Sequence, residues 1–222
     1  GTVYSEKEIE MLVKLVKKHK LFLISDEVYR EFVYDGKKHV SVLNYIDEIP
    51  EQVILLDSMS KRYSLCGARL GMFVTKNQEI LDGILRVAQG RLSAGLVDQL
   101  MGAKLTDVDS SYFKKVHKEY QMRRDVLYKG LKSIKGVKLE KPEGAFYTVV
   151  ELPVEDTQHF CQWLLTDFRY NNGTVMLAPA EGFYATPGLG KNEVRIAYVL
   201  NAGDLKKAIE ILRRGLLEYK LL

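Results

Sequence analysis

The chain has 222 residues, of which 46% are hydrophobic and 28% are charged, as in ordinary globular proteins rather than disordered ones. Its formal net charge of +4 comes from lysines and arginines spread along the chain, so no nucleic-acid partner is expected. Its two cysteines, far apart in sequence, fit neither a disulfide framework nor a zinc site, which favours a reducing, cytoplasmic setting. No apolar stretch is long enough to span a bilayer, so no membrane partner is expected either.

The first part of the chain alternates helical and strand-like patterns. Ser5 and Glu8 have the spacing of a capping box in front of an apolar helical face. Three apolar runs predict strands, at residues 21–25, 53–57 and 71–76, and two amphipathic segments predict helices, at residues 78–90 and 110–133. Because helices and strands alternate, this part predicts an α/β fold.

The later part has a different order of elements. Residues around Gly144 suggest a pair of strands, residues 156–170 a helix, and residues 192–200 another strand. A closing helix is predicted with Asp204 as its N-cap. We therefore expect two domains, 1–133 and 134–222, the second a smaller α+β domain after a long charged helix.

Polar residues follow two of the predicted strands. Asp26 comes after the first strand, and Ser58, Ser60 and Lys61 come after the second. Because α/β sheets bind ligands at the carboxyl ends of their parallel strands, we expect these side chains to share one site. A lysine in a partly desolvated site loses its proton more easily and can form a Schiff base.

Arg69 follows Lys61 by eight positions and lies between Gly67 and Gly71. A guanidinium fork and serine hydroxyls can hold a phosphate, and glycines let the backbone approach it closely. A buried aspartate, as expected of Asp26, would keep a neighbouring aromatic nitrogen base protonated. A lysine, a phosphate site and such a carboxylate together predict a pocket for pyridoxal phosphate.

The segments SDEVYREFVYDG (25–36) and SMSKRYSLCGARLG (58–71) closely resemble the fold type I pyridoxal-phosphate-dependent aminotransferases, the aspartate aminotransferase class. The resemblance continues through PEGAFY (142–147) and NEVRIAYV (192–199) to the final helix. It implies the carboxy-terminal portion of such an enzyme. The corresponding fold is part of the mostly parallel, three-layer major domain, with a linking helix, followed by the small carboxy-terminal domain.

The resemblance also implies a role for each residue of the pocket. Lys61 would form the aldimine with pyridoxal 5'-phosphate and act as the catalytic residue. Asp26 would pair with the pyridine nitrogen, Tyr29 would hydrogen-bond the ring hydroxyl, and Arg195 would bind the α-carboxylate of the substrate. The cofactor phosphate would be bound by three residues: Ser58, Ser60 and Arg69.

Each of these residues, taken alone, also has a structural explanation. Lys61 could be one solvated lysine among many, Asp26 a helix cap and Arg69 half of a surface ion pair. Ser60 could cap the next turn, and Arg195 could pair with a carboxylate on its strand. Their order, their spacing and their shared position at strand ends favour the functional interpretation.

The resemblance implies a cytoplasmic aminotransferase that moves an amino group between an amino acid, aspartate or a similar one, and a 2-oxo acid. A homodimer is expected for the full-length protein. Two alternatives remain: a lyase or decarboxylase on the same fold, and the cofactor- or amino-acid-sensing domain of a transcription regulator. Gly1 resembles the last residue of the family's Asn-Pro-Thr-Gly turn, so the chain is expected to lack the amino-terminal half and to be inactive alone.

Overall fold

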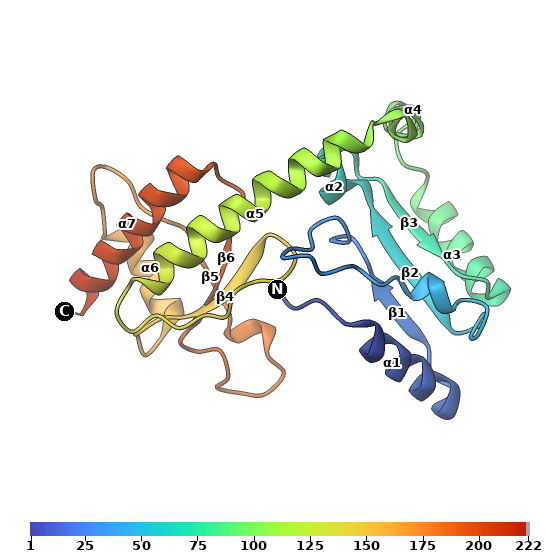
Figure 1. Ribbon diagram of the computed structural model, residues 1–222, viewed down its shortest axis with the longest axis horizontal. Coiled ribbons are helices and arrows are strands. Elements are labelled where there is room, and N and C mark those ends of the chain that lie inside the picture. The colour runs from blue at the N-terminus through green and yellow to red at the C-terminus, as the bar shows by residue number, and fades with distance from the viewer. Residues whose placement is uncertain (221–222) are drawn as a thin grey trace. The chain divides into compact units, whose positions relative to one another are not determined.

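The computed structural model describes residues 1–220 (Figure 1). It divides the chain into a first unit, Val3–Lys115, and a second unit that starts at Val116 and includes Gly1–Thr2. The long helix α5 (Ser110–Lys132) begins in the first unit and ends in the second. The domain boundary predicted just after this helix stays a prediction.

The first unit contains a three-stranded mixed sheet in the order β1-β2-β3. Strand β1 (Leu23–Asp26) runs parallel to β2 (Val53–Ser58), whereas β3 (Gly71–Val74) runs antiparallel to β2. These strands and the predicted helices at 78–90 and 110–133 are confirmed, but helix α4 was not predicted from the sequence. Besides α5, the helices of this unit are α1 (Glu6–His19), α2 (Met59–Arg62), α3 (Gln78–Arg91) and α4 (Leu96–Ala103).

Helix α1 packs its apolar side against the sheet, and Figure 1 shows it beside β1. The predicted capping box is present, because Ser5 Oγ accepts a hydrogen bond from the Glu8 amide and the Glu8 carboxylate accepts one from the Ser5 amide. Burial of apolar side chains then stabilises the helix on the sheet. The shared core cluster consists of Ile9, Val13, Val16, Val42, Ile49, Val53 and Leu55.

The second unit is a compact α+β structure, as predicted. Its sheet is antiparallel in the order β4-β6-β5. The central strand alternates buried and outward-facing residues, the pattern of a sheet with one covered face. Its strands are β4 (Tyr147–Glu151), β5 (Ala178–Pro179) and β6 (Glu193–Ala197), and its helices besides α5 are α6 (Thr157–Thr166) and α7 (Ala202–Tyr219).

The prediction that Asp204 caps the closing helix is wrong. The N-cap is Asn201, whose side-chain oxygen accepts a hydrogen bond of 3.0 Å from the Asp204 amide. Asp204 instead lies in the first turn, where its carboxylate accepts a hydrogen bond from the Asn201 side-chain amide. Asparagine and aspartate are about equally good caps, so the residue type alone did not fix the start of the helix.

The strand pair predicted around Gly144 is also wrong in part. The segment before it forms a single bridge, from Lys138 to Glu151, and β4 pairs instead with β6. Pro142 lies between the two predicted partners and has no amide hydrogen to donate to a ladder.

Candidate active site

The carboxyl ends of β1 and β2 lie side by side, as the sequence predicted. In the parallel register Asp26, the last residue of β1, pairs with Leu56, and the Glu27 amide donates a hydrogen bond of 2.9 Å to the Leu56 carbonyl. Strand β2 ends two residues later, at Ser58. The pairing therefore brings Asp26 and Ser58, predicted from separate motifs, to one edge of the sheet.

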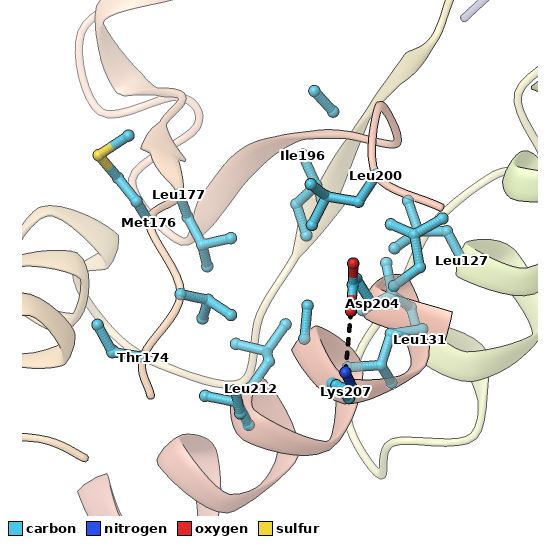
Figure 2. Close-up of a pocket in the computed structure, with 16 residues that line it drawn as sticks. Leu127, Leu131, Thr174, Met176, Leu177, Ile196, Leu200, Asp204, Lys207 and Leu212 are labelled. Carbon is cyan, nitrogen blue, oxygen red and sulfur yellow. Dashed lines mark hydrogen bonds and ion pairs between the residues drawn. The ribbon is translucent and has the colours of Figure 1, made fainter. Parts of the chain in front are cut away.

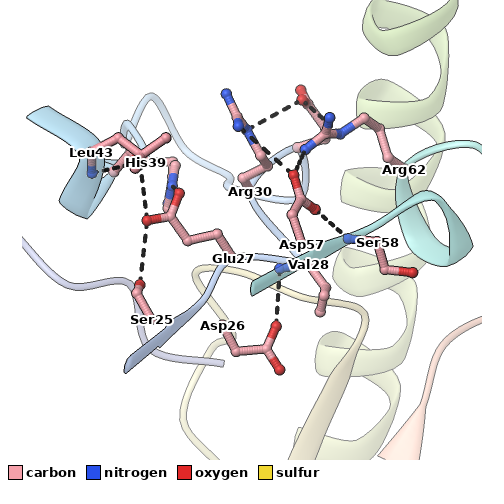
Figure 3. A network of polar contacts seen from close by, with 12 residues as sticks. Ser25, Asp26, Glu27, Val28, Arg30, His39, Leu43, Asp57, Ser58 and Arg62 are labelled. Atoms are coloured by element: carbon pink, nitrogen blue, oxygen red, sulfur yellow. Dashed lines mark hydrogen bonds and ion pairs between the residues drawn. The ribbon is translucent and has the colours of Figure 1, made fainter. Parts of the chain in front are cut away.

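Each strand end carries one outward-facing candidate and one buried carboxylate (Figure 3). The expectation that Asp26 is buried is wrong, because Asp26 is exposed and its neighbour Glu27 is only 3% exposed. Asp57 is buried, whereas the next residue, Ser58, is half-buried. The alternation follows from the period of two in an extended chain, which turns successive side chains to opposite faces.

Hydrogen-bond donors from four residues surround the buried Glu27 carboxylate, and Figure 3 labels two of these residues, Ser25 and His39. His39 Nε2 lies 2.8 Å from it, the Val42 amide 2.9 Å, Ser41 Oγ 3.0 Å and Ser25 Oγ 3.3 Å. Burial alone would raise the pKa of Glu27, but the donors outweigh burial, so the pKa lies below its ordinary value. This carboxylate ties the segment around His39 to the end of β1.

The buried Asp57 carboxylate anchors helix α2, which carries Lys61. It forms an ion pair with Arg62, the last residue of α2, and accepts a hydrogen bond of 2.7 Å from the Ser58 amide. Arg62 Nε also lies 3.4 Å from a carboxylate oxygen of Glu31. These contacts hold both ends of the short helix next to β2.

Lys61 lies near Tyr29, one of the residues predicted to contact the cofactor ring. Its Nζ atom is 5.9 Å from the centroid of the tyrosine ring. The Asp26 carboxylate accepts a hydrogen bond of 3.2 Å from the Val28 amide. The end of β1 and helix α2 therefore supply an amine, a phenol and a carboxylate to the same region of the first unit.

The two predicted phosphate-binding serines are in direct contact. Ser58 Oγ lies 2.8 Å from Ser60 Oγ, accepts a hydrogen bond of 3.0 Å from the Ser60 amide, and lies 3.1 Å from the Leu70 carbonyl. Ser58, rather than Ser60, is the N-cap of α2. The structural alternative for Ser60, a cap of the next turn, therefore applies to Ser58.

Strand β3 returns Arg69 toward the end of β2, because Gly71 pairs with Ser58 in the antiparallel register. Arg69 is exposed, its backbone is left-handed with φ of 52°, and its Nη1 donates a hydrogen bond of 3.0 Å to the Cys66 carbonyl. Among residues 1–220 its guanidinium forms no ion pair, so part of the fork is available to an anion. Arg69 also lines a hollow of about 510 Å³ bordered by α3.

Arg195, the predicted substrate-binding residue, belongs to the second unit. It lies on β6 with its side chain exposed, and its guanidinium is within cation–π distance of the rings of Tyr147 and Phe183. The other six predicted site residues all belong to the first unit.

Sequence reasoning missed the anchoring role of Glu27 and Asp57, and it missed an apolar cavity of about 330 Å³ in the second unit (Figure 2). Leu131 and Ile196 line this cavity, and the ion pair between Asp204 and Lys207 also borders it. Its walls come from four separate segments, so no local pattern could reveal it. It contains none of the predicted site residues.

Within residues 1–220 no group of histidine, cysteine, aspartate or glutamate side chains is arranged to hold a metal ion. In the same range no helix combines the length and the apolar character needed to cross a bilayer.

Comparison with known proteins decides the family. The family described as aminotransferase class I and II matches residues 1–212. The chain belongs to this family. Aspartate aminotransferases of Bacillus subtilis (strain 168) and Pyrococcus abyssi (strain GE5 / Orsay) are 28% and 29% identical to it. These matches cover 96% and 100% of this chain but 54% and 55% of the relatives, so the chain spans about half their length.

Solved structures confirm the fold class and the resemblance to fold type I enzymes. The aromatic aminotransferase of Pyrococcus horikoshii OT3 superposes with a TM-score of 0.85 at 29% identity, covering 100% of this chain and 58% of that one. LysN, the α-aminoadipate aminotransferase of Thermus thermophilus, has the same fold, with a TM-score of 0.87 at 22% identity over 100% of this chain and 57% of its own.

The Glu27 network makes a prediction about stability. Glu27→Gln should lower the free energy of unfolding at pH 7 by about 1–3 kcal/mol, because a buried charged acceptor of several hydrogen bonds is lost. The pKa of Glu27 is lowered in the folded state, so its contribution is present above the ordinary value of 4.5 and is lost as the pH falls through the folded value. The difference from wild type should therefore shrink in acid.

Urea unfolding followed by circular dichroism at pH 7 and at about pH 3 measures this effect. Glu48→Gln is the control, because Glu48 pairs with Lys17 but is half exposed, and exposed pairs contribute about 1 kcal/mol or less. Equal stability of Glu27→Gln and wild type at pH 7 would contradict the anchoring role.

Proposed function

We propose that the whole protein is a pyridoxal-phosphate-dependent aminotransferase, which moves an amino group between an amino acid, aspartate or a similar one, and a 2-oxo acid. The observation that carries the proposal is the position of Lys61, on α2 at the carboxyl end of β2 and 5.9 Å from the Tyr29 ring. Family membership and relatives named aspartate aminotransferase support it. The same relatives favour transamination over the lyase, decarboxylase and sensor alternatives.

The residues of the first unit fit pyridoxal phosphate chemically. Ser58 and Ser60 place two hydroxyls 2.8 Å apart, and Arg69 offers the part of its fork that Cys66 does not use. Hydroxyls and a guanidinium suit a phosphate. Asp26, exposed at the end of β1, would stabilise a protonated pyridine nitrogen, and Tyr29 would donate its phenol hydrogen to the ring oxygen.

The residues of the chain would divide the chemistry as follows. Bound pyridoxal phosphate supplies an electron sink for the bond broken at the substrate α-carbon. Lys61 Nζ would hold the cofactor and, once released, remove and return the α-proton as a general base. Asp26 would keep the ring nitrogen charged. Arg195 would bind the α-carboxylate through two parallel hydrogen bonds and so fix the orientation of the α-carbon.

The proposal includes a homodimer of the whole protein. Large apolar side chains on and just before α4 are exposed: Leu92 is 76%, Leu96 71% and Val97 77% exposed. An exposed apolar patch of this kind supports the proposal that another polypeptide surface packs against it. A cytoplasmic location stays a prediction.

Replacing Lys61 tests the central assignment. In the whole protein Lys61→Ala should abolish the visible absorbance band of covalently held pyridoxal phosphate, because the attaching amine is removed. Absorbance titration of the purified protein with the cofactor measures this. Lys76→Ala is the control, since Lys76 is half exposed and pairs with Asp47. A wild-type band in the Lys61 variant would mean that another lysine holds the cofactor.

Replacing Arg195 tests the substrate site. Arg195→Lys should raise the KM for the amino acid about tenfold or more and leave the cofactor absorbance unchanged, because the charge remains while bidentate geometry is lost. Steady-state kinetics with 2-oxoglutarate as the acceptor measures the change. Arg214→Lys is the control, since Arg214 is exposed and also lies over an aromatic ring. Loss of the cofactor band instead would place Arg195 in the cofactor site or the framework.

A further inference from the structure

We propose that Phe183 and Tyr147 are positioning residues that hold the Arg195 guanidinium in the plane needed to bind a carboxylate. This inference rests on the proposed function, because it concerns the same arginine. All three residues belong to the second unit, so the contacts between them lie within that unit.

The alternation along β6 turns Arg195 away from the core. Val194 and Tyr198 are fully buried and Ile196 is nearly so, whereas Arg195 is exposed. The two neighbouring strands also fix the backbone position of Arg195, which pairs with Val149 of β4 and with Ala178 of β5. The backbone of Arg195 is therefore fixed in the central strand, and only the orientation of its side chain is left to be set by other contacts.

Two aromatic rings set that direction. The carbon at the centre of the guanidinium lies 4.8 Å from the centroid of the Phe183 ring and 5.5 Å from that of the Tyr147 ring. Both distances are within the range of a cation–π interaction. Among residues 1–220 no carboxylate lies within ion-pair distance of Arg195. Two aromatic rings, and no carboxylate of residues 1–220, therefore lie against the guanidinium.

The turn that carries Phe183 is fixed to β6. Phe183 ends a short 3-10 helix, η4 (Glu181–Phe183), and its amide donates to the Ala180 carbonyl. The Ala180 amide donates a hydrogen bond of 2.9 Å to the Glu193 carbonyl. On the other side of Phe183, the Tyr184 hydroxyl donates to the Glu193 carboxylate. Phe183 is thus anchored on both sides, although its own ring is 60% exposed.

The backbone conformation and the close packing of Gly190, in the same turn, both require glycine. Its φ is 74°, in the left-handed region, and a Cβ at this position would overlap the Tyr184 ring. The close packing of Gly190 under Tyr184 holds that ring against β6. The exposed Phe183 ring is therefore part of a fixed turn rather than of a loose loop.

Contacts with aromatic rings suit a carboxylate-binding arginine better than an ion pair does. A carboxylate partner from the protein would occupy the edge of the guanidinium and compete with the substrate. Aromatic faces restrict the plane of the fork without using its N–H groups, and bidentate binding depends on that plane. Removing a ring should therefore weaken carboxylate binding without removing any group that touches the carboxylate.

The test uses the whole protein loaded with cofactor and succinate as an unreactive dicarboxylate probe. Phe183→Leu should raise the dissociation constant of succinate and the KM of the amino acid about two- to fivefold, the size of an exposed cation–π interaction. Phe183→Tyr, which keeps the aromatic face, should restore wild-type values, and the cofactor absorbance should stay unchanged. Tyr147→Leu, with Tyr147→Phe as its rescue, tests the second ring independently.

Tyr170→Leu is the matched control, because Tyr170 lies under another exposed arginine, Arg214, at 5.4 Å. It should leave succinate binding unchanged. If Arg195→Lys weakens binding while Phe183→Leu and Tyr147→Leu both bind as wild type, the positioning role is wrong and the proposed function stands. If Arg195→Lys itself binds succinate as wild type, the assignment of Arg195 fails and the inference fails with it.

Discussion

The parallel pairing of β1 with β2 is the interaction on which the candidate site depends. This pairing brings the carboxyl ends of both strands to one edge of the sheet. There the Glu27 amide donates a hydrogen bond to the Leu56 carbonyl. Without this register Asp26 would not lie beside the segment that carries Ser58 and Lys61. The apolar cluster under α1 holds the same two strands together from one face. Packing in the core and the placement of polar groups at the edge are therefore coupled.

Charged groups serve two separate purposes in the structure. The buried carboxylates of Glu27 and Asp57 are satisfied by donors and cations from later segments, and they anchor the chain around the site. Arg69 and Arg195 form no ion pair within residues 1–220. The carboxylates stabilise the framework, whereas these two arginines keep their charge available to anions.

Much of this could be predicted from the sequence because the signals are local. The apolar run 53–57 followed by Ser58 and Lys61 predicts a strand end with a functional residue, and the family resemblance assigns the roles. Local patterns could not reveal the aromatic support of Arg195, since Phe183 is brought to it by β5 and a turn. The closing helix is capped by Asn201 rather than Asp204 because two adequate caps compete within one turn. Contacts between distant segments, rather than residue types, decide such details.

The attachment site of the cofactor tests the central claim most directly. The whole protein would be incubated with pyridoxal phosphate, reduced with borohydride and digested, and the modified peptide would be sequenced by mass spectrometry. A single stoichiometric modification is expected, on Lys61. Modification of a different lysine at full occupancy, with Lys61 unchanged, would contradict it.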